Sequence, residues 1–443
     1  MYKTLTKTFG LRRSRYWFGR CVAGWLLGVL LSHHLSAQVT IPSGSYIIQM
    51  NANTSAADKG LKPYGMIHEL VKFYNVPVLW VVKEGKAKDA TDYVINGTAY
   101  SGSLFVISSE FLSSSVQTVI NQWRAASNTT NGGNGYTRGF VTANQIPSDY
   151  TFQGAKTMTI RSVPLWTLDD KNGKISEKFI QNAGIPSSAY NRIDPQNLGA
   201  CNDIFVMPHA DPKWSTHGNL LTWNQVSKGS IWAGCHAISA LENTYNPANI
   251  SQQMNFLTRK VTAAGTGIVL PQAGKTSYSQ NSLVLWDKHK DGTPAYLTNA
   301  AMPVTQTGKA TPADDWVSQY LGTSDLAHTN GSEQIYMPVL GGGWRDEANV
   351  IAYDPTQEDV PGKSPGVAAV IVYGQAFGDP NRGSVMYESG HDINENNASG
   401  VAAMRAFFNW SFMTMEGKTP HVGPIAAVGA SGSNMAVPVQ LSV

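Results

Sequence analysis

The sequence predicts an α/β protein in which a mostly parallel sheet is flanked by helices and interrupted by long irregular insertions. Strand-like and helix-like segments alternate through the first half of the chain. The strands expected at residues 203–207 and 230–234 are apolar on both faces, which is typical of strands inside a parallel sheet covered by helices. Regular segments return at 366–413, after a Gly-, Pro- and Asn-rich stretch of about 246–365 that we interpret as an irregular insertion.

The segments of the first half fall into two kinds. Short apolar, β-branched and aromatic runs predict strands at residues 45–50, 76–82, 103–108 and 157–166. Apolar residues at helical spacing predict helices at residues 61–74, 113–126 and 175–182. In the second of these helices, one face carries Val116, Val119, Ile120 and Trp123. Residues 128–135 are polar and Gly-rich and predict a loop.

The later segments carry the residues whose side chains could act in catalysis or metal binding. The strand at 203–207 leads into Pro-His-Ala-Asp, and the strand at 230–234 leads directly into Cys235 and a helix that runs to residue 243. A helix is expected between them at residues 219–226. After the insertion, the expected elements are strands at 366–373 and 383–388 and a helix at 400–413.

The N-terminus predicts a secretory signal peptide over residues 1–37. A basic leader precedes an apolar run of about 11 residues and the small-residue exit Leu35-Ser36-Ala37. That run is shorter than the roughly 20 residues that span a bilayer, although a retained anchor is the alternative. We therefore expect export to the periplasm, the cell surface or the medium, a domain over 38–416, and a linker or the start of a further domain over 417–443.

The charge balance argues against a nucleic-acid partner. The chain has 33 basic and 30 acidic residues, and six of the basic ones belong to the predicted leader. The remaining chain therefore has 27 basic and 30 acidic residues. The apparent basicity is therefore a property of the leader, and no basic stripe follows it. No later segment is apolar and long enough to span a membrane, and the low charge content is common in exported bacterial proteins.

Two cysteines, Cys201 and Cys235, remain after the leader. One precedes its strand and the other ends a neighbouring strand expected to be parallel, so they should lie roughly 15–20 Å apart, against a Cα limit of about 7 Å for a disulfide. Cys235 is therefore expected to be a free thiol.

Residues 230–242 have the pattern of a nucleophile elbow, in which a strand reverses sharply into a helix and holds a nucleophile at the turn. Small residues are required on both sides of the nucleophile, and Ala233 and Ala237 flank Cys235 at those positions. A helix N-terminus also lowers a thiol pKa and leaves N–H groups available for an oxyanion. A buried structural cysteine is the alternative interpretation.

Three motifs in order resemble class I glutamine amidotransferase-like domains, a superfamily with a flavodoxin-like fold. They are residues 203–211, the elbow at 230–243, and Gly-Ser-Val-Met-Tyr-Glu-Ser-Gly-His at 383–391, followed by the helix at 400–413. The resemblance implies Cys235 as nucleophile and His391 as general base. Ile393 stands where the family has its orienting glutamate, so Asp392 or Glu395 would take that role, as in an exported noncanonical member.

The alternative chemistry at this edge of the sheet is metal binding. His209, Asp211 and His217 follow a predicted strand, where the loops of parallel sheets build ligand sites. Imidazole and carboxylate groups ligate zinc and other divalent metals, although this spacing matches no specific zinc signature. A structural role for these residues, as turn caps or surface groups, is the other interpretation.

The sequence thus leaves three functions open. The first is a cysteine-dependent amidase or hydrolase that acts through an acyl-enzyme, with the N–H of His236 and one from the His209 loop as the oxyanion hole. The second is a non-catalytic binding module of a modular surface protein. The third is the metal site. No organic cofactor is expected, and the ligand would be a small molecule, a peptide or a glycan.

Overall fold

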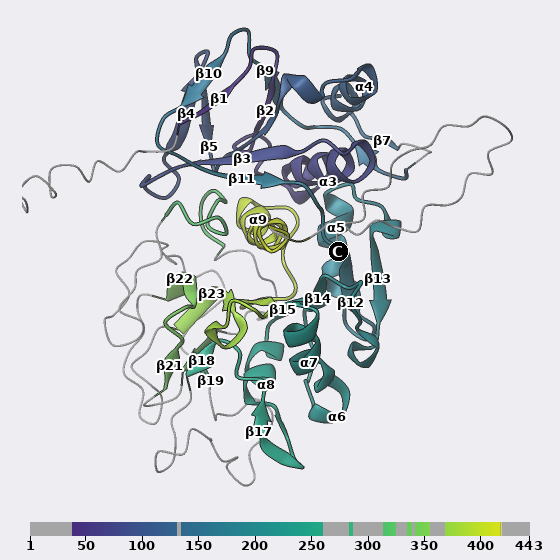
Figure 1. Ribbon diagram of the computed structural model, residues 1–443, viewed down its shortest axis with the longest axis vertical. Helices are drawn as coiled ribbons and strands as arrows, with labels where there is room; N and C mark the ends of the chain where they lie inside the picture. Colours follow the sequence, from purple (N-terminus) through teal and green to yellow (C-terminus); the bar gives the residue numbers. More distant parts are fainter. Residues whose placement is uncertain are drawn as a thin grey trace, which may run out of the picture.

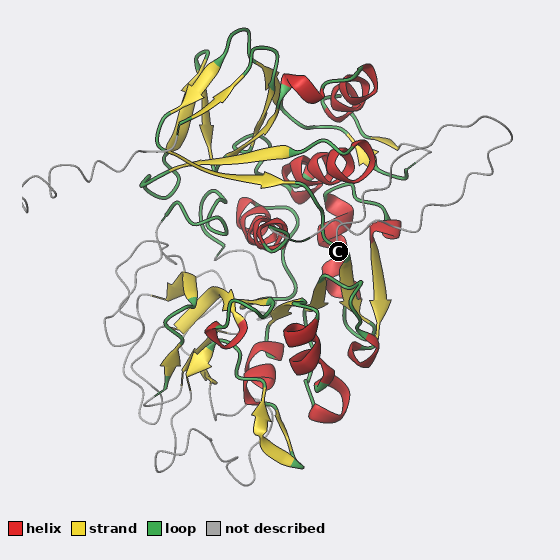
Figure 2. Ribbon diagram, in the orientation of Figure 1, coloured by secondary structure: helices red, strands yellow, loops and turns green. Residues whose placement is uncertain are grey.

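The computed structural model describes residues 38–130, 134–259, 283–286, 313–324, 335–338, 342–354, 368–416 and 418 (Figures 1 and 2). The predicted signal peptide, almost all of the predicted linker at 417–443 and much of the predicted insertion lie outside these residues. None of the helices that the described residues form has the length and apolar character needed to cross a membrane.

The N-terminal part is built on a five-stranded sheet in the order β11-β3-β6-β2-β9, in which every pairing is antiparallel. Its strands are β2 (Tyr46–Gln49), β3 (Val78–Lys83), β6 (Leu104–Ile107), β9 (Ala143–Gln145) and β11 (Ala155–Ile160). The accompanying helices are α2 (Ala57–Gly60), α3 (Lys62–Tyr74), α4 (Ser114–Trp123) and the short 3-10 helix η1 (Ser109–Phe111). The predicted apolar face of α4 is confirmed, because all four of its named side chains are buried.

Three two-stranded sheets border this part. They pair β1 (Val39–Ile41) with β10 (Tyr150–Phe152), β4 (Thr91–Ile95) with β5 (Thr98–Ser101), and β7 (Thr129–Thr130) with β8 (Thr137–Arg138). All three are antiparallel, and the first two enclose a small core of their own with the outer face of the five-stranded sheet.

The second large sheet has nine strands and carries the residues of interest. One half is parallel and consists, in order, of β13 (Tyr190–Ile193), β12 (Trp166–Asp169), β14 (Ile204–Met207), β15 (Ser230–Gly234) and β24 (Ser384–Glu388). The other half is antiparallel and consists of β23 (Ala368–Gln375), β20 (Ile335–Pro338), β19 (Leu283–Trp286) and β22 (Asn349–Asp354). Three of these strands come from the segment predicted to be an irregular insertion.

Short elements complete the described chain. The helices are α5 (Lys174–Asn182), α6 (Trp214–His217), α7 (Asn219–Val226), α8 (Ala237–Asn243) and α9 (Ala398–Met413), with the 3-10 turns η2 (Ser187–Ala189), η3 (Pro195–Asn197) and η6 (Ala376–Gly378). Two further antiparallel pairs are β16 (Tyr245–Asn246) with β17 (Asn249–Gln253), and β18 (Thr258–Arg259) with β21 (Gly343–Trp344).

The prediction of a mostly parallel, flavodoxin-like sheet is wrong. The structure is strand-rich, with several small antiparallel sheets, and the nine-stranded sheet itself contains four parallel and four antiparallel pairings. The difference begins in the first half, where alternation of strand and helix favours parallel neighbours. β2 and β3 do flank α3, but β6 lies between them and pairs antiparallel with both. Hydrophobic periodicity shows which faces are buried and carries no information on strand direction.

Helix α9 lies between the two large sheets (Figure 1). Every residue from Gly400 to Phe412 is buried, as expected of a helix that is apolar all round. Its single basic residue, Arg405, is fully buried and donates hydrogen bonds to the carbonyl oxygens of Met50 and Gly60 in the N-terminal part. The Asn397 side chain caps the helix by accepting from Gly400 N at 2.7 Å.

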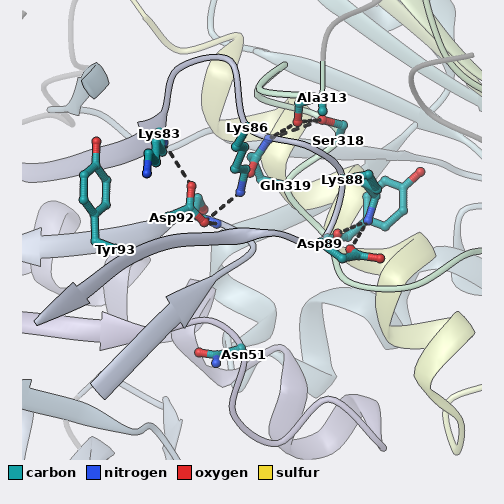
Figure 3. Close-up of polar contacts among 12 residues, drawn as sticks. Asn51, Lys83, Lys86, Lys88, Asp89, Asp92, Tyr93, Ala313, Ser318 and Gln319 are labelled. Carbon is teal, nitrogen blue, oxygen red and sulfur yellow. Dashed lines mark hydrogen bonds and ion pairs between the residues drawn. The ribbon is translucent and has the colours of Figure 1, made fainter. Parts of the chain in front are cut away.

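A short segment, residues 313–324, joins the two parts from the side. Asp314 accepts a hydrogen bond from Gly85 N at 2.9 Å, and Asp315 accepts one from the Tyr373 hydroxyl of β23 at 2.7 Å. Figure 3 shows Ser318 and Gln319 turned back onto the Ala313 carbonyl, close to the buried Lys86–Asp92 ion pair. The segment therefore ties the β3–β4 connection to the nine-stranded sheet.

Candidate functional site

Three adjacent parallel strands deliver the candidate residues to one place. His209 follows β14, Cys235 follows β15 directly, and His391 follows β24. The strands pair in register, with Met207 opposite Ala233 and Gly234 opposite Glu388, so their carboxyl ends lie side by side. The ligand atoms of His209, Cys235 and His391 all lie within 4.8 Å of one another, and this histidine–cysteine cluster is the candidate site.

Cys235 occupies the sharp turn that the elbow pattern predicts. Its φ is +51°, in the left-handed region that residues with a Cβ rarely occupy. Its N–H donates to the Glu388 carbonyl at 3.3 Å, and its own carbonyl accepts from Ile238 N at 3.3 Å. The surrounding structure thus holds a strained residue between β15 and α8. Cys201 is exposed and Cys235 is buried, and both are free thiols, which confirms the prediction for Cys235.

Gly234 allows the three strand ends to converge. A Cβ built at this position would lie 2.8 Å from the Pro208 carbonyl oxygen and 2.9 Å from the Gly390 carbonyl oxygen. These carbonyls belong to the loops that carry His209 and His391. The residue before the thiol therefore needs to be glycine for the cluster to close.

Replacing Gly234 by alanine is expected to force these two loops apart by overpacking, with a loss of about 1–3 kcal/mol in the free energy of unfolding and a larger loss of Cys235 reactivity. Urea unfolding and thiol labelling measure the two effects. Gly199→Ala is the matched control, because nothing lies within 4 Å of a Cβ there. Equal behaviour of the two variants would show that the close approach at Gly234 is unimportant.

Burial decides the protonation state of the thiol. Desolvation raises the pKa of Cys235 to about 11, and the N–H of His236, which bonds to the sulfur, lowers it by less. The expectation of a thiol pKa lowered by the helix N-terminus is therefore wrong. The resting thiol is protonated at neutral pH, and a nucleophilic Cys235 needs a base to take its proton.

Alkylation of Cys235 by iodoacetamide is expected to be slow at neutral pH and to rise about tenfold per unit of pH up to about pH 10, because only the thiolate reacts. The experiment uses the Cys201→Ala variant, which removes the exposed thiol. In urea the same thiol should titrate near ~8.5. A plateau already at neutral pH in the folded protein would contradict a thiol kept neutral by burial.

The histidines form a chain around the sulfur. His236 Nδ1 lies 3.7 Å from Cys235 Sγ, and His236 Nε2 lies 3.4 Å from Asp211 Oδ1. The His209 ring packs against those of His236 and His391, with centroids 4.1 and 4.4 Å apart. Burial, followed by the nearby His209, lowers the pKa of His236, whereas Asp211 opposes the shift. His236 is thus neutral at pH 7 and able to accept a proton.

The predicted orienting acids contact helix α5. Lys178 Nζ pairs with Asp392 Oδ1 at 3.3 Å and with Glu395 Oε1 at 3.5 Å, and Asn182 donates to Glu395 Oε2 at 2.5 Å. These contacts fix the loop that follows His391 onto α5. The orienting role of either acid towards His391 stays a prediction.

The predicted metal ligands are only partly brought together. His209 belongs to the cluster, but Asp211 faces His236, and His217 accepts a hydrogen bond at Nδ1 from Lys213 N at 3.1 Å. Burial lowers the pKa of His217. Among the described residues, the group that could hold a metal is therefore His209 with Cys235 and His391, and not with Asp211 and His217.

Two features of the site escaped the sequence reasoning. One is the Asp211–His236 contact, which a residue directly after the elbow cysteine could have suggested. The other is Glu388, a fully buried carboxyl at the end of β24 that accepts from Trp232 Nε1 at 3.2 Å and whose pKa burial raises to about 8. The local sequence contains one signal for Glu388, which is an acidic residue at the end of an apolar strand, three residues before His391.

A scan of the chain against protein-family models finds no match, and neither does a search of the curated proteins.

Proposed function

We propose that this chain is an exported cysteine-dependent amidase or hydrolase that works through an acyl-enzyme on Cys235. The observation that carries the proposal is a strained cysteine at φ +51° whose sulfur lies within 4.8 Å of nitrogen atoms of both His209 and His391. Strained backbone concentrates at functional sites, and a thiol within reach of imidazole is the minimum apparatus of nucleophilic acyl transfer. The order of motifs that resembles class I amidotransferase-like domains supports the same chemistry.

In this mechanism the thiol proton passes to the imidazole of His391 while the sulfur attacks the carbonyl carbon of an amide or ester. The C–S bond forms, and the tetrahedral intermediate collapses with breakage of the bond to the leaving group, which takes the proton from the imidazolium. Water then attacks the thioester, so that a carboxylic acid and the free thiol are released. Transfer of the proton during attack is required because burial keeps the resting thiol neutral.

Stabilisation of the oxyanion is assigned to backbone N–H groups at the turn. The N–H of His236 already bonds to the sulfur, so it points towards the reacting centre. The N–H of Cys235 itself bonds to the Glu388 carbonyl and is not available. The second donor would come from the His209 loop, and the acyl group would belong to a peptide, another amide or a glycan fragment.

The test is covalent labelling with p-nitrophenyl acetate in the Cys201→Ala variant. We expect a burst of p-nitrophenolate and an acetyl group on the peptide that contains Cys235, with both lost in Cys235→Ala. Mass spectrometry locates the adduct. A folded protein whose Cys235 stays unmodified would overturn the nucleophile and favour a non-catalytic binding module.

The second candidate function is binding of a divalent metal ion. The observation that favours it is the cluster itself, since two imidazoles and a thiol lie close enough to share one ion. In addition, His209 Nδ1 is buried and has no hydrogen-bond partner among the described residues, although polar atoms so buried are usually satisfied.

A further inference from the structure

The donor atoms of the histidine–cysteine cluster select the kind of cation that it could bind. Two imidazole nitrogens and one sulfur form a borderline-soft set that suits Zn²⁺, Co²⁺ or Cu²⁺, whereas Mg²⁺ and Ca²⁺ require oxygen ligands. None of the three grouped residues is a carboxylate. The cluster is thus unsuited to the hard cations and suited to thiophilic ones.

The spacing is compatible with tetrahedral coordination after a small adjustment. Zn–S and Zn–N bonds of about 2.3 and 2.0–2.1 Å place neighbouring ligand atoms roughly 3.3–3.6 Å apart. The ligand atoms here lie within 4.8 Å, so a contraction of about 1 Å through side-chain rotation is sufficient. Three protein ligands leave a fourth position open to water or another ligand.

We propose that the cluster of His209, Cys235 and His391 binds one thiophilic divalent cation, and that bound metal and acyl transfer exclude each other at Cys235. On binding, the S–H bond breaks, a sulfur–metal bond forms and one proton is released. The metal also occupies the lone pair with which His391 would accept the thiol proton. This inference rests on the proposed function, because the metal acts as a reversible inhibitor only if Cys235 is a nucleophile.

The binding arm of the test uses Co²⁺ titrated into the metal-free Cys201→Ala protein. We expect one equivalent to bind with a thiolate-to-cobalt charge-transfer band in the near ultraviolet, which Zn²⁺ then abolishes by displacement. Cys235→Ala should lose the band. Loss of a group that only hydrogen-bonds to a metal ligand weakens metal binding roughly 10- to 100-fold. Because His209 would be a ligand itself, His209→Ala should weaken cobalt binding by more than this.

His217→Asn is the matched control for the binding arm. The amide oxygen of asparagine can replace the Nδ1 acceptor for Lys213 N, so the helix start is kept, and the cluster is untouched. We expect unchanged cobalt affinity in this variant. Loss of affinity in His217→Asn with retention in Cys235→Ala would overturn the proposed ligand set.

The activity arm measures acetylation of Cys235 by p-nitrophenyl acetate with and without one equivalent of Zn²⁺, followed by a chelator. We expect at least about a tenfold loss of labelling with zinc and full recovery after chelation. Absence of a thiolate–cobalt band with normal labelling would refute the metal site and leave the hydrolase standing. A cobalt band without labelling in metal-free protein would refute the hydrolase and the inhibition and leave the metal site. Labelling that zinc does not affect, despite the band, would refute the mutual exclusion.

Discussion

Replacing His391 by alanine is expected to slow acylation of Cys235 by roughly 100- to 10,000-fold, the usual effect of losing a general base. The thiol is neutral at rest because burial raises its pKa to about 11, so attack without a base would proceed through a very small thiolate fraction. The burst rate with p-nitrophenyl acetate measures the effect. Because the base would no longer be present, the remaining rate should increase with pH in proportion to the thiolate.

Comparing the effects of variants at His391 and at His236 shows which of the two histidines is the base. His236 Nδ1 lies 3.7 Å from the sulfur and its Nε2 faces Asp211, so it is the competing base. If His391 is the base, Asp211→Asn should change the burst rate by less than about tenfold. A large loss in both His236→Ala and Asp211→Asn, with a mild effect of His391→Ala, would transfer the role of base to His236 and leave Cys235 as the nucleophile.

The second large effect is expected on stability, when Arg138 is replaced by methionine. Arg138 and Glu69 form a buried ion pair in the N-terminal part, and Glu69 Oε2 also accepts from Trp123 Nε1 at 2.8 Å. Removing the guanidinium leaves a buried carboxylate with one neutral donor, which typically lowers the free energy of unfolding by about 3–5 kcal/mol. The shift of the urea midpoint at unchanged slope measures the loss.

Arg192→Met is the matched control for the stability prediction. Its guanidinium pairs with Glu177 at 2.5 Å on a partly exposed surface, where such pairs contribute about 0–1 kcal/mol. In a second control, Glu69→Gln combined with Arg138→Met should recover part of the stability, because the uncompensated charge is gone. Similar losses in Arg138→Met and Arg192→Met would contradict the assigned importance of the buried pair.

Features with a local signal could be predicted from the sequence. The apolar face of α4, the helix α9 and the turn at Cys235 depend on residues a few positions apart, and the structure contains all three. The direction of the strands depends on pairings between distant segments. β6 lies between β2 and β3 although it follows both in the chain, and no residue in β2 or β3 encodes that insertion.

The part of the candidate site that lies directly after the parallel strands could be predicted from the sequence. His209, Cys235 and His391 each follow one of three adjacent parallel strands, so their meeting needs only strand order. The direction in which each loop turns afterwards is set by packing. Asp211 turns to His236 and His217 turns to the start of α6, so neither joins His209. The raised thiol pKa likewise results from the burial of Cys235, which the residues next to it in the sequence do not reveal.

The position of α9 has a consequence for the order of folding. This helix fills the space between the two large sheets, and Arg405 bonds to carbonyls about 345 and 355 residues earlier in the chain. Contacts of such long range form slowly, and here they cannot form until almost all of the described chain has been synthesised. Until then the faces of both sheets that pack against α9 are not buried by it. Completion of the shared core between the two sheets is therefore a late step in folding.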